Sequence, residues 1–200
     1  MARRNEHTKG ELKALALDAV LVIAERDGPQ VVSARKVAQE IGYAPGMLYH
    51  LFENIDDLIL QANTRTVSAL TDDLVRATKR QSADKAVLTM ALRYLQLAQK
   101  NGRRWQLLFE HTMRNGVAVP SWYQAQTAKL FGLVEQQLVR MCPQKKSAEI
   151  QLAARAVWSA VHGVCLLSVT GKLNVGGAVK EARLVESLVQ NYLHGWKSID

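Results

Sequence analysis

The chain is poor in the residues that mark secreted, metal-binding and membrane proteins. Only 2 of its 200 residues are cysteines, Cys142 and Cys165, and neither has a second ligand at metal-binding spacing. We interpret both as small buried residues of a protein that works in the reducing cytoplasm. No apolar run approaches the roughly 18 residues that cross a bilayer. The richest early stretch, residues 14–24, contains Asp18 and lacks a small-residue cleavage site, so it predicts a helix and not a signal peptide.

The sequence also lacks the motifs of common catalytic and cofactor sites. It contains no His-Glu-x-x-His, no glycine-rich phosphate loop, no Gly-x-Ser-x-Gly and no clustered pair of carboxylates. We therefore expect a protein that is not an enzyme and that holds no metal or cofactor. Its histidines are scattered without metal-ligand spacing, at His7, His50, His111, His162 and His194.

Basic residues exceed acidic ones, but the excess lies far from the N-terminus. The formal net charge is +8, from 26 Lys and Arg against 18 Asp and Glu. Residues 1–53 hold seven of each sign and residues 54–80 hold four of each, so the whole excess falls in residues 81–200. Net charge describes solubility and nonspecific attraction. It therefore identifies no nucleic-acid-binding segment in the first part of the chain.

Apolar residues recur at three- and four-residue steps along almost the whole chain, and no long stretch alternates with period 2. This pattern predicts an all-helical protein with about nine helices. Capping residues, glycines and prolines indicate where each helix begins and ends. The expected helices cover about residues 8–27, 33–40, 45–52, 54–77, 82–100, 103–114, 120–142, 147–171 and 178–196.

The second and third of these helices form a tight corner that is typical of a helix-turn-helix. Ser33 is a capping residue, and Val37 and Ile41 lie on the buried side of the first of the two helices. Ala38 is small enough for two helices to cross closely, and Gly42 supplies the left-handed residue that the turn needs. The buried side of the second helix then consists of Leu48, Leu51 and Phe52.

The outward surface of that second helix carries few charges and begins with small residues, so it fits a DNA major groove. Tyr49 and His50 are suited to hydrogen bonds with phosphate oxygens, and Arg35 and Lys36 would face the opposite strand. Such corners also occur in helical bundles that never bind DNA, where Tyr49 and His50 would be ordinary surface residues. The candidate DNA-contacting residues are Ser33, Arg35, Lys36, Tyr43, Ala44, Pro45, Gly46, Met47, Tyr49 and His50.

This N-terminal region resembles the TetR/AcrR family of bacterial regulators. The resemblance lies in Ile41-Gly42-Tyr43, in the run from Gly46 to Phe52 and in Asp56-Asp57-Leu58, and it covers about residues 8–60. The resemblance implies a helix-turn-helix DNA-binding domain over residues 1–54. It also implies a helical domain over residues 55–200 that dimerises and binds a small-molecule inducer.

Two positions depart from the pattern of this family. The family often has Ser or Thr where this chain has Ala44, and Lys where it has Ile55. We therefore expect fewer phosphate contacts than usual and weaker nonspecific DNA binding. Arg3, Arg4 and Lys9 compensate if the N-terminal arm enters the minor groove. A solubilising tail is the alternative interpretation of the arm.

The C-terminal half contains a Trp-x-x-x-His-Gly sequence, Trp158 to Gly163, that resembles a signature of one subclass of the family. Trp158 and His162 share a helix face, and His162 is either part of a ligand pocket or a core histidine. Arg103 and Arg104 either favour an anionic ligand or are solvated surface. Aromatic residues at helical spacing are more often plain core than a binding site. If a pocket lies between the helices, we expect it to be lined by Trp105, Phe109, Met113, Trp122, Phe131, Trp158 and His162.

The last helix has a broad apolar face, which together with the eighth helix predicts a four-helix dimer interface. An ordinary core face is the alternative. We predict a cytoplasmic homodimeric repressor that a small molecule releases from a palindromic DNA operator. The competing hypothesis is a helical ligand-binding or interaction protein without specific DNA binding. The candidate interface residues are Val157, Val161, Val164, Leu184, Leu188, Tyr192 and Trp196.

Overall fold

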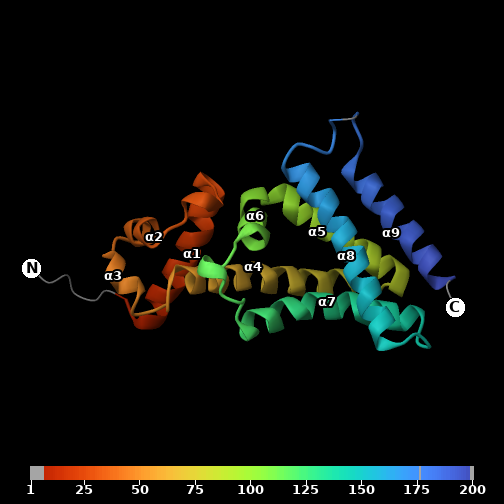
Figure 1. Ribbon diagram of the computed structural model, residues 1–200, viewed down its shortest axis with the longest axis horizontal. Helices are drawn as coiled ribbons and strands as arrows, with labels where there is room; N and C mark the ends of the chain where they lie inside the picture. The colour runs from red at the N-terminus through yellow and green to blue at the C-terminus, as the bar shows by residue number, and fades with distance from the viewer. Residues whose placement is uncertain (1–6, 176, 199–200) are drawn as a thin grey trace, which may run out of the picture. The chain divides into compact units, whose positions relative to one another are not determined.

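The computed structural model describes residues 7–175 and 177–198, and within these ranges it contains nine α-helices and no β-strand (Figure 1). The prediction of an all-helical chain is confirmed. Two short 3-10 helices, Pro29–Val31 and Arg114–Gly116, are additional to the sequence-based expectation. The α-helices are α1 Lys9–Asp27, α2 Ala34–Ile41, α3 Pro45–Leu48, α4 Ile55–Thr78, α5 Ala83–Lys100, α6 Gly102–Glu110, α7 Ser121–Met141, α8 Ser147–Val169 and α9 Glu181–Lys197.

The described residues divide into two compact units. Unit 1 holds the residues up to Thr66 together with Asn101–Tyr123, and unit 2 holds Val67–Lys100 and the residues from Gln124 onward. The chain therefore passes from one unit to the other within α4, and α6 belongs to the same unit as α1, α2 and α3. The functional domain boundary near residue 54 remains a prediction.

In unit 1, α1 packs against α2 and α6. The helix begins with a reciprocal cap, in which the Thr8 hydroxyl accepts the Glu11 N–H at 3.3 Å and the Glu11 carboxylate accepts the Thr8 N–H at 2.7 Å. A fully buried aliphatic side chain contributes about 1.5–3 kcal/mol, so the apolar core makes a large favourable contribution to the stability of this unit. That core includes Val20, Ile23, Val37, Leu48, Phe52, Leu58 and Leu107.

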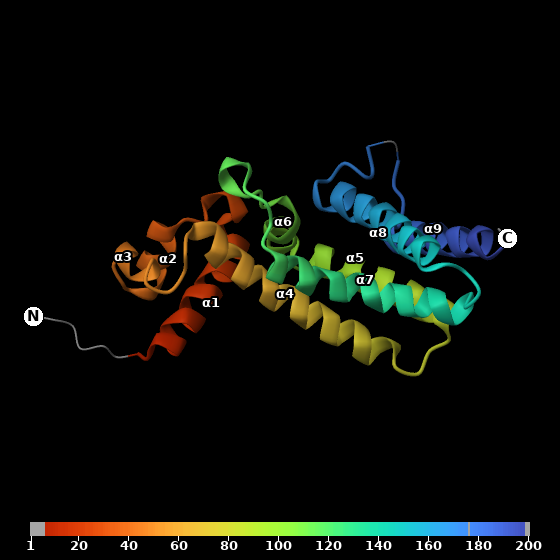
Figure 2. The same cartoon turned by 60° about the horizontal axis from the view of Figure 1, so that its bottom comes forward.

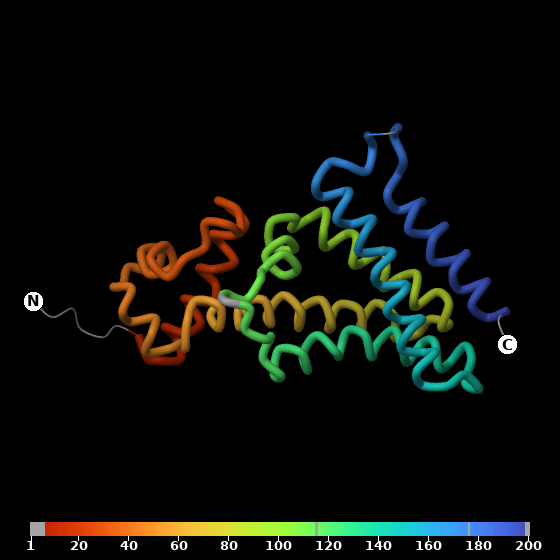
Figure 3. Tube along the Cα trace, in the orientation of Figure 1, coloured from red at the N-terminus to blue at the C-terminus, as the bar shows by residue number. Residues whose placement is uncertain are grey.

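In unit 2, α5, α8 and α9 pack against one another (Figure 2). The loop from α8 to α9 joins the two helices at one end, so they run antiparallel (Figure 3). Their buried faces repeat at three- and four-residue steps, as expected for helices covered on one side. The central residues are Met90, Leu95, Val157, Val161, Val185 and Val189.

Three helix ends differ from the sequence-based expectation by three residues or more. The helix expected over residues 45–52 is α-helical only as far as Leu48. After Leu48 the backbone tightens, because the His50 N–H bonds to the Met47 carbonyl and the Leu51 N–H bonds to the Leu48 carbonyl, each three residues back. Likewise α6 ends at Glu110 and not near residue 114, and α9 begins at Glu181 and not at residue 178.

Candidate nucleic-acid interface

The corner between α2 and α3 has the geometry that its sequence predicts. The Ser33 hydroxyl caps α2 by accepting the Lys36 N–H at 3.3 Å. Ala38 is completely buried, and the Tyr43 N–H closes the turn on the Ala38 carbonyl at 2.9 Å. Gly42 has a φ of 76°, in the left-handed region, while a β-carbon there would meet no atom within 4 Å. The backbone angle and not a lack of space therefore favours glycine at this position.

Beyond this corner, α3 presents small residues to solvent, and two polar side chains follow it. Pro45 occupies the first turn, and Leu48 is buried beneath it. Tyr49 is 59% exposed and His50 is also exposed, so both side chains are available to a partner outside the chain. Ala44 stands at the N-cap position and provides no side-chain hydrogen bond to the helix. The residues predicted for DNA contact therefore lie on two segments of unit 1, the first turn of α2 with its cap Ser33 and the segment from Tyr43 to His50.

His7 anchors the start of the N-terminal arm beside this segment. Its Nδ1 shares a hydrogen bond of 2.9 Å with the Tyr43 hydroxyl, and the two rings meet edge to face at 6.2 Å. The arm residues Arg3 and Arg4 lie outside the described residues, whereas Lys9 is exposed on the first turn of α1. The contact places the point at which the arm leaves α1 next to Tyr43, two residues before α3 begins. No motif in the sequence predicts this pair.

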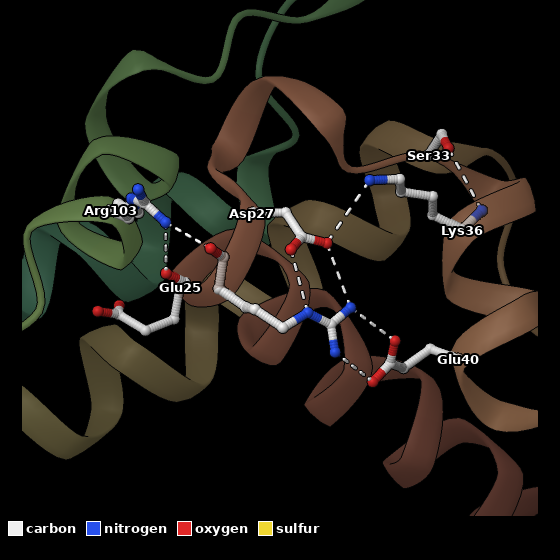
Figure 4. Close-up of polar contacts among 7 residues, drawn as sticks. Glu25, Asp27, Ser33, Lys36, Glu40 and Arg103 are labelled. Carbon is white, nitrogen blue, oxygen red and sulfur yellow. Dashed lines mark hydrogen bonds and ion pairs between the residues drawn. The ribbon is translucent and has the colours of Figure 1, made fainter.

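A cluster of charges holds the end of α1 against α2 (Figure 4). The Arg26 guanidinium contacts the Asp27 carboxylate at 3.1 Å and the Glu40 carboxylate at 2.8 Å. Hydrogen bonds from Arg26 lower the pKa of both carboxyls. Lys36 Nζ also lies 3.5 Å from Asp27. Lys36 is therefore already partly neutralised, whereas Arg35 is exposed and forms no ion pair within the described part of the chain.

The two arginines at the start of α6 contact α1. Arg103 donates hydrogen bonds to the carbonyls of Glu25 and Arg26, in the last turn of α1 (Figure 4). The Nε of Arg104 lies 3.7 Å from the Glu25 carboxylate. Cations at a helix C-terminus interact favourably with the helix dipole. This pair of arginines therefore joins two helices of unit 1. From the sequence we expected either an anionic ligand or solvated surface at these residues, and not this structural role.

A buried acid and a half-buried base meet at the start of α4. The Asp56 carboxylate is only 7% exposed, and its Oδ1 lies 3.4 Å from His111 Nε2 and 3.7 Å from Arg114 Nε. Its Oδ2 accepts the Arg114 N–H at 3.2 Å. Burial lowers the pKa of His111, and this effect outweighs the opposing attraction of Asp56. The contact at neutral pH is therefore one between a carboxylate and a neutral imidazole.

His111 gives the stability a pH dependence with a defined sign. Because the pKa of His111 in the folded state lies below its ordinary value of 6.5, the unfolded chain binds protons more readily. The free energy of unfolding should be highest above pH 6.5 and fall as the pH is lowered towards 5. Thermal unfolding followed by circular dichroism from pH 5 to pH 8 should show a smaller decline for His111→Gln than for the unchanged chain.

The matched control is His194→Gln, because His194 is exposed on α9. This substitution should leave the pH dependence of the free energy of unfolding unchanged. Carboxyls with lowered pKa values, such as Glu11 and Asp27, start from ordinary values of 4.5 and 3.8 and so titrate outside this window. Burial also lowers the pKa of His162, so some decline remains in the variant. If His111→Gln loses as much stability between pH 8 and pH 5 as the unchanged chain does, the prediction is wrong.

In unit 2, three of the residues predicted for a ligand pocket lie in contact with one another. The rings of Phe131 and Trp158 lie 5.4 Å apart, and those of Trp158 and His162 lie 4.8 Å apart. His162 Nδ1 shares a hydrogen bond of 2.8 Å with the hydroxyl of Tyr94 on α5. The Arg155 guanidinium lies 3.8 Å from the centre of the Phe131 ring. The sequence did not single out Tyr94 or Arg155, since neither belongs to a recognisable motif.

The other predicted pocket residues belong to unit 1. Trp105 is completely buried and its ring lies 5.0 Å from Phe109. Met113 follows α6 and is half-buried, whereas Trp122 is 40% exposed. The seven predicted pocket residues are thus divided between the two units. A single pocket that contains all of them remains a prediction.

The predicted interface residues also fall into two groups. Val157, Val161 and Val164 on α8 are buried within the chain itself. The outward apolar residues of α8 are different ones, Leu152 at 72% exposure, Leu166 at 37% and Leu167 at 42%. On α9 the predicted residues are half-buried, namely Leu184, Leu188, Tyr192 and Trp196.

The chain also matches a model of a known protein family. Residues 87–192, more than half of the chain, match the model described as the tetracyclin repressor-like, C-terminal domain. The chain belongs to the TetR family. The resemblance seen in the N-terminal sequence is therefore confirmed by a match in a different part of the chain. TetR-family proteins are transcription regulators and not enzymes, while the Trp-x-x-x-His-Gly subclass remains a prediction.

Solved structures share the fold over most of the chain. A TetR-family transcriptional regulator from Streptomyces coelicolor has a TM-score of 0.69 at 19% identity, covering 92% of this chain and 80% of its own. A TetR-like regulator from Rhodococcus sp. RHA1 has 0.61 at 20% identity, covering 98% and 100%. The regulator FadR from Bacillus subtilis, solved with stearoyl-CoA, has 0.68 at 12% identity, covering 91% and 98%. No curated protein matches the chain.

Helix α8 is more apolar than we expected from the sequence. The 23 residues of α8 are long and apolar enough to cross a membrane, with a mean hydropathy of 1.5 and 33% of that window buried. No unbroken apolar run marks this helix in the sequence, because the charged Arg155 interrupts it. The mean hydropathy of the helix remains high in spite of that residue. Core helices of soluble proteins pass the same test. The whole of α8 also lies within the matched TetR-family region.

Proposed function

We propose that this TetR-family protein is a homodimeric repressor that binds a palindromic operator through α3 and the residues that follow it. The observation that carries the proposal is the corner of unit 1, where a left-handed Gly42 and a buried Ala38 fix α3 while Tyr49 and His50 remain exposed. In a helix-turn-helix the second helix enters the major groove. Tyr49 and His50 then hydrogen-bond to phosphates at the edge of the groove.

Arg35 and the N-terminal arm supply further contacts in this proposal. Arg35 is the exposed cation at the start of α2, whereas Lys36 must give up part of its pairing with Asp27 to reach a phosphate. The hydrogen bond between His7 and Tyr43 brings the beginning of the arm to the same side as α3. Few cations face the DNA, so binding depends on specific hydrogen bonds more than on counterion release.

Two copies of the chain are needed to read a palindrome. We infer that they meet through the outward face of α8, where Leu152 and Leu166 lie on the same side of the helix. The half-buried Leu188, Tyr192 and Trp196 of α9 complete the apolar surface. Contact between these faces gives a four-helix interface and also explains why α8 is so apolar. Such a regulator works in the cytoplasm, where the DNA is.

A small molecule bound in unit 2 controls the affinity for DNA in this proposal. FadR, which shares the fold, was solved with stearoyl-CoA. In this chain the neighbouring rings of Phe131, Trp158 and His162 line the proposed site, and the Tyr94 hydroxyl holds His162 in place. A ligand that binds more tightly to one conformation of the dimer shifts the population towards it and so changes DNA affinity.

Selection from a random DNA library tests the function directly. At about physiological salt the protein should enrich a twofold-symmetric sequence, whose half-site centres lie about 34–36 Å apart or a multiple of that distance. A mobility-shift assay with unrelated competitor DNA should leave the selected complex intact. If binding is equally strong to all sequences and disappears as salt rises, the competing hypothesis of a helical ligand-binding or interaction protein is favoured.

A further inference from the structure

Unit 1 contains an open cavity of about 730 Å³ next to the candidate DNA-contacting segment. Its walls come from α1, from the segment that joins α3 to α4, from the first turns of α4 and from Trp122. All lining residues belong to unit 1. Cavities that bind small molecules usually measure about 300–1,000 Å³. The cavity is thus large enough for a small organic molecule.

The charged groups of the lining are acidic. Glu53 and Asp57 line the cavity, and no Lys or Arg does. The Asp57 carboxylate accepts the Glu53 N–H at 3.1 Å and the Gln61 side-chain amide at 2.8 Å, so its position is fixed. The Glu53 carboxylate is exposed and has no ion pair or hydrogen bond within the described ranges. The lining therefore contains the Asp57 carboxylate, which is fixed by hydrogen bonds, and the Glu53 carboxylate, which can pair with a ligand.

Aromatic rings form a second part of the lining. Trp122 is 40% exposed, and its ring stands edge to face at 5.7 Å against the buried Tyr123. Tyr49 and Phe52 also line the cavity. The Lys13 ammonium lies 5.5 Å from the centre of the Phe52 ring, so this ring already has a cation of the chain. The aromatic rings left to a ligand are those of Trp122 and Tyr49. Aromatic faces attract cations, most strongly where water is excluded.

Carboxylates beside aromatic rings match one class of ligand. An anion would be repelled by Glu53 and Asp57, and no group of three metal-ligating residues occurs within the described part of the chain. We propose that this cavity binds a small organic cation with an apolar or aromatic body, such as a quaternary ammonium or phosphonium ion. The charge of the ligand lies near Glu53, and its body lies against Trp122. This site is separate from the ligand site proposed in unit 2.

The location gives the site a regulatory consequence. Tyr49 and His50 line the same cavity, and they are the residues that contact phosphate in the proposed function. A bound cation would restrict both side chains and so lower DNA affinity directly, without a change that begins in unit 2. This consequence rests on the proposed function, whereas binding of the cation does not.

Isothermal titration calorimetry of the full chain with tetraphenylphosphonium, in the absence of DNA, tests the proposal. The chain should bind one cation saturably, and Glu53→Gln should weaken binding at least fivefold because it removes the charge but keeps the shape. Trp122→Leu should weaken it by a similar factor. Asp72→Asn is the matched control, since Asp72 is an exposed acid on α4 outside the cavity, and it should leave the affinity unchanged.

Tetraphenylborate provides a second control, because it has nearly the same shape and the opposite charge. It should bind at least tenfold more weakly than tetraphenylphosphonium. The proposal is overturned if the unchanged chain shows no saturable binding, if Glu53→Gln binds as tightly as the unchanged chain, or if the two ions bind equally. Circular dichroism of each variant verifies that it is folded. DNA is absent throughout, so failure here is distinguishable from failure of the proposed DNA binding.

Discussion

The double variant Tyr49→Phe, His50→Ala should bind the selected operator at least about 100-fold more weakly than the unchanged chain. A hydrogen bond to a charged group contributes about 1.5–3 kcal/mol, so loss of two such bonds costs about 3 kcal/mol or more. Both side chains are exposed, and neither packs in the core of unit 1. The variant should therefore keep its fold, and the loss should appear in equilibrium mobility-shift titrations.

The pattern of the loss distinguishes phosphate contacts from base contacts. Because phosphate contacts position the protein without reading sequence, affinity for mutated operators should fall by the same factor as affinity for the selected one. Tyr49→Phe alone changes no charge, so it should lower affinity without altering the dependence on salt concentration. His194→Ala removes an exposed histidine from α9 and should have no effect. Unchanged affinity of the double variant would show that α3 does not contact DNA in the proposed way.

The corner that supports this prediction could be derived from the sequence because its determinants are local. Ser33, Ala38 and Gly42 each act through one steric or hydrogen-bonding requirement that short-range spacing expresses. The end of α3 could not be derived in this way. Leu51 and Phe52 keep the apolar spacing of a helix, yet the His50 and Leu51 N–H groups bond three residues back, while the Phe52 N–H still bonds four residues back to the Leu48 carbonyl. Apolar spacing does not distinguish an α-helix from a tighter turn over so few residues.

Contacts between distant segments account for most of what the sequence did not reveal. The approach of His111 to Asp56 joins residues 55 positions apart, and that of His162 to Tyr94 joins residues 68 apart. Nothing in the local sequence specifies either partner. By contrast, Thr8 and Glu11 have the spacing of a capping box and could have been recognised from the sequence.

The faces of α8 show a different limit. Helical periodicity groups Val157, Val161 and Val164 on one face correctly, but it does not say what covers that face. Burial within the chain shows that they belong to the core of unit 2. The face opposite carries Leu152 and Leu166, with the exposed Ser159 and the half-exposed Gly163 between them. Spacings of seven, four and three residues place these four on one side of α8.

Gly163→Leu should convert the proposed homodimer to a monomer, with a dimer dissociation constant raised about 100-fold or more. A β-carbon at Gly163 would meet no atom of the chain within 4 Å, so the substitution fits the isolated protomer. A glycine in the middle of a helix costs about 1 kcal/mol relative to alanine, and leucine should make the isolated protomer more stable. Two α8 helices that approach closely at this point would have no room for the larger side chain.

Sedimentation velocity across micromolar concentrations measures this effect. Leu166→Glu should give the same result, because it places an unpaired charge in an apolar interface at a cost of about 2–5 kcal/mol. Val117→Glu is the control, since Val117 is 60% exposed and belongs to unit 1, whereas α8 belongs to unit 2. Both α8 variants should lose operator binding, because one α3 reads only half of a palindrome. A dimeric Gly163→Leu, or an unchanged chain that is monomeric at micromolar concentration, would exclude this face of α8 as the interface.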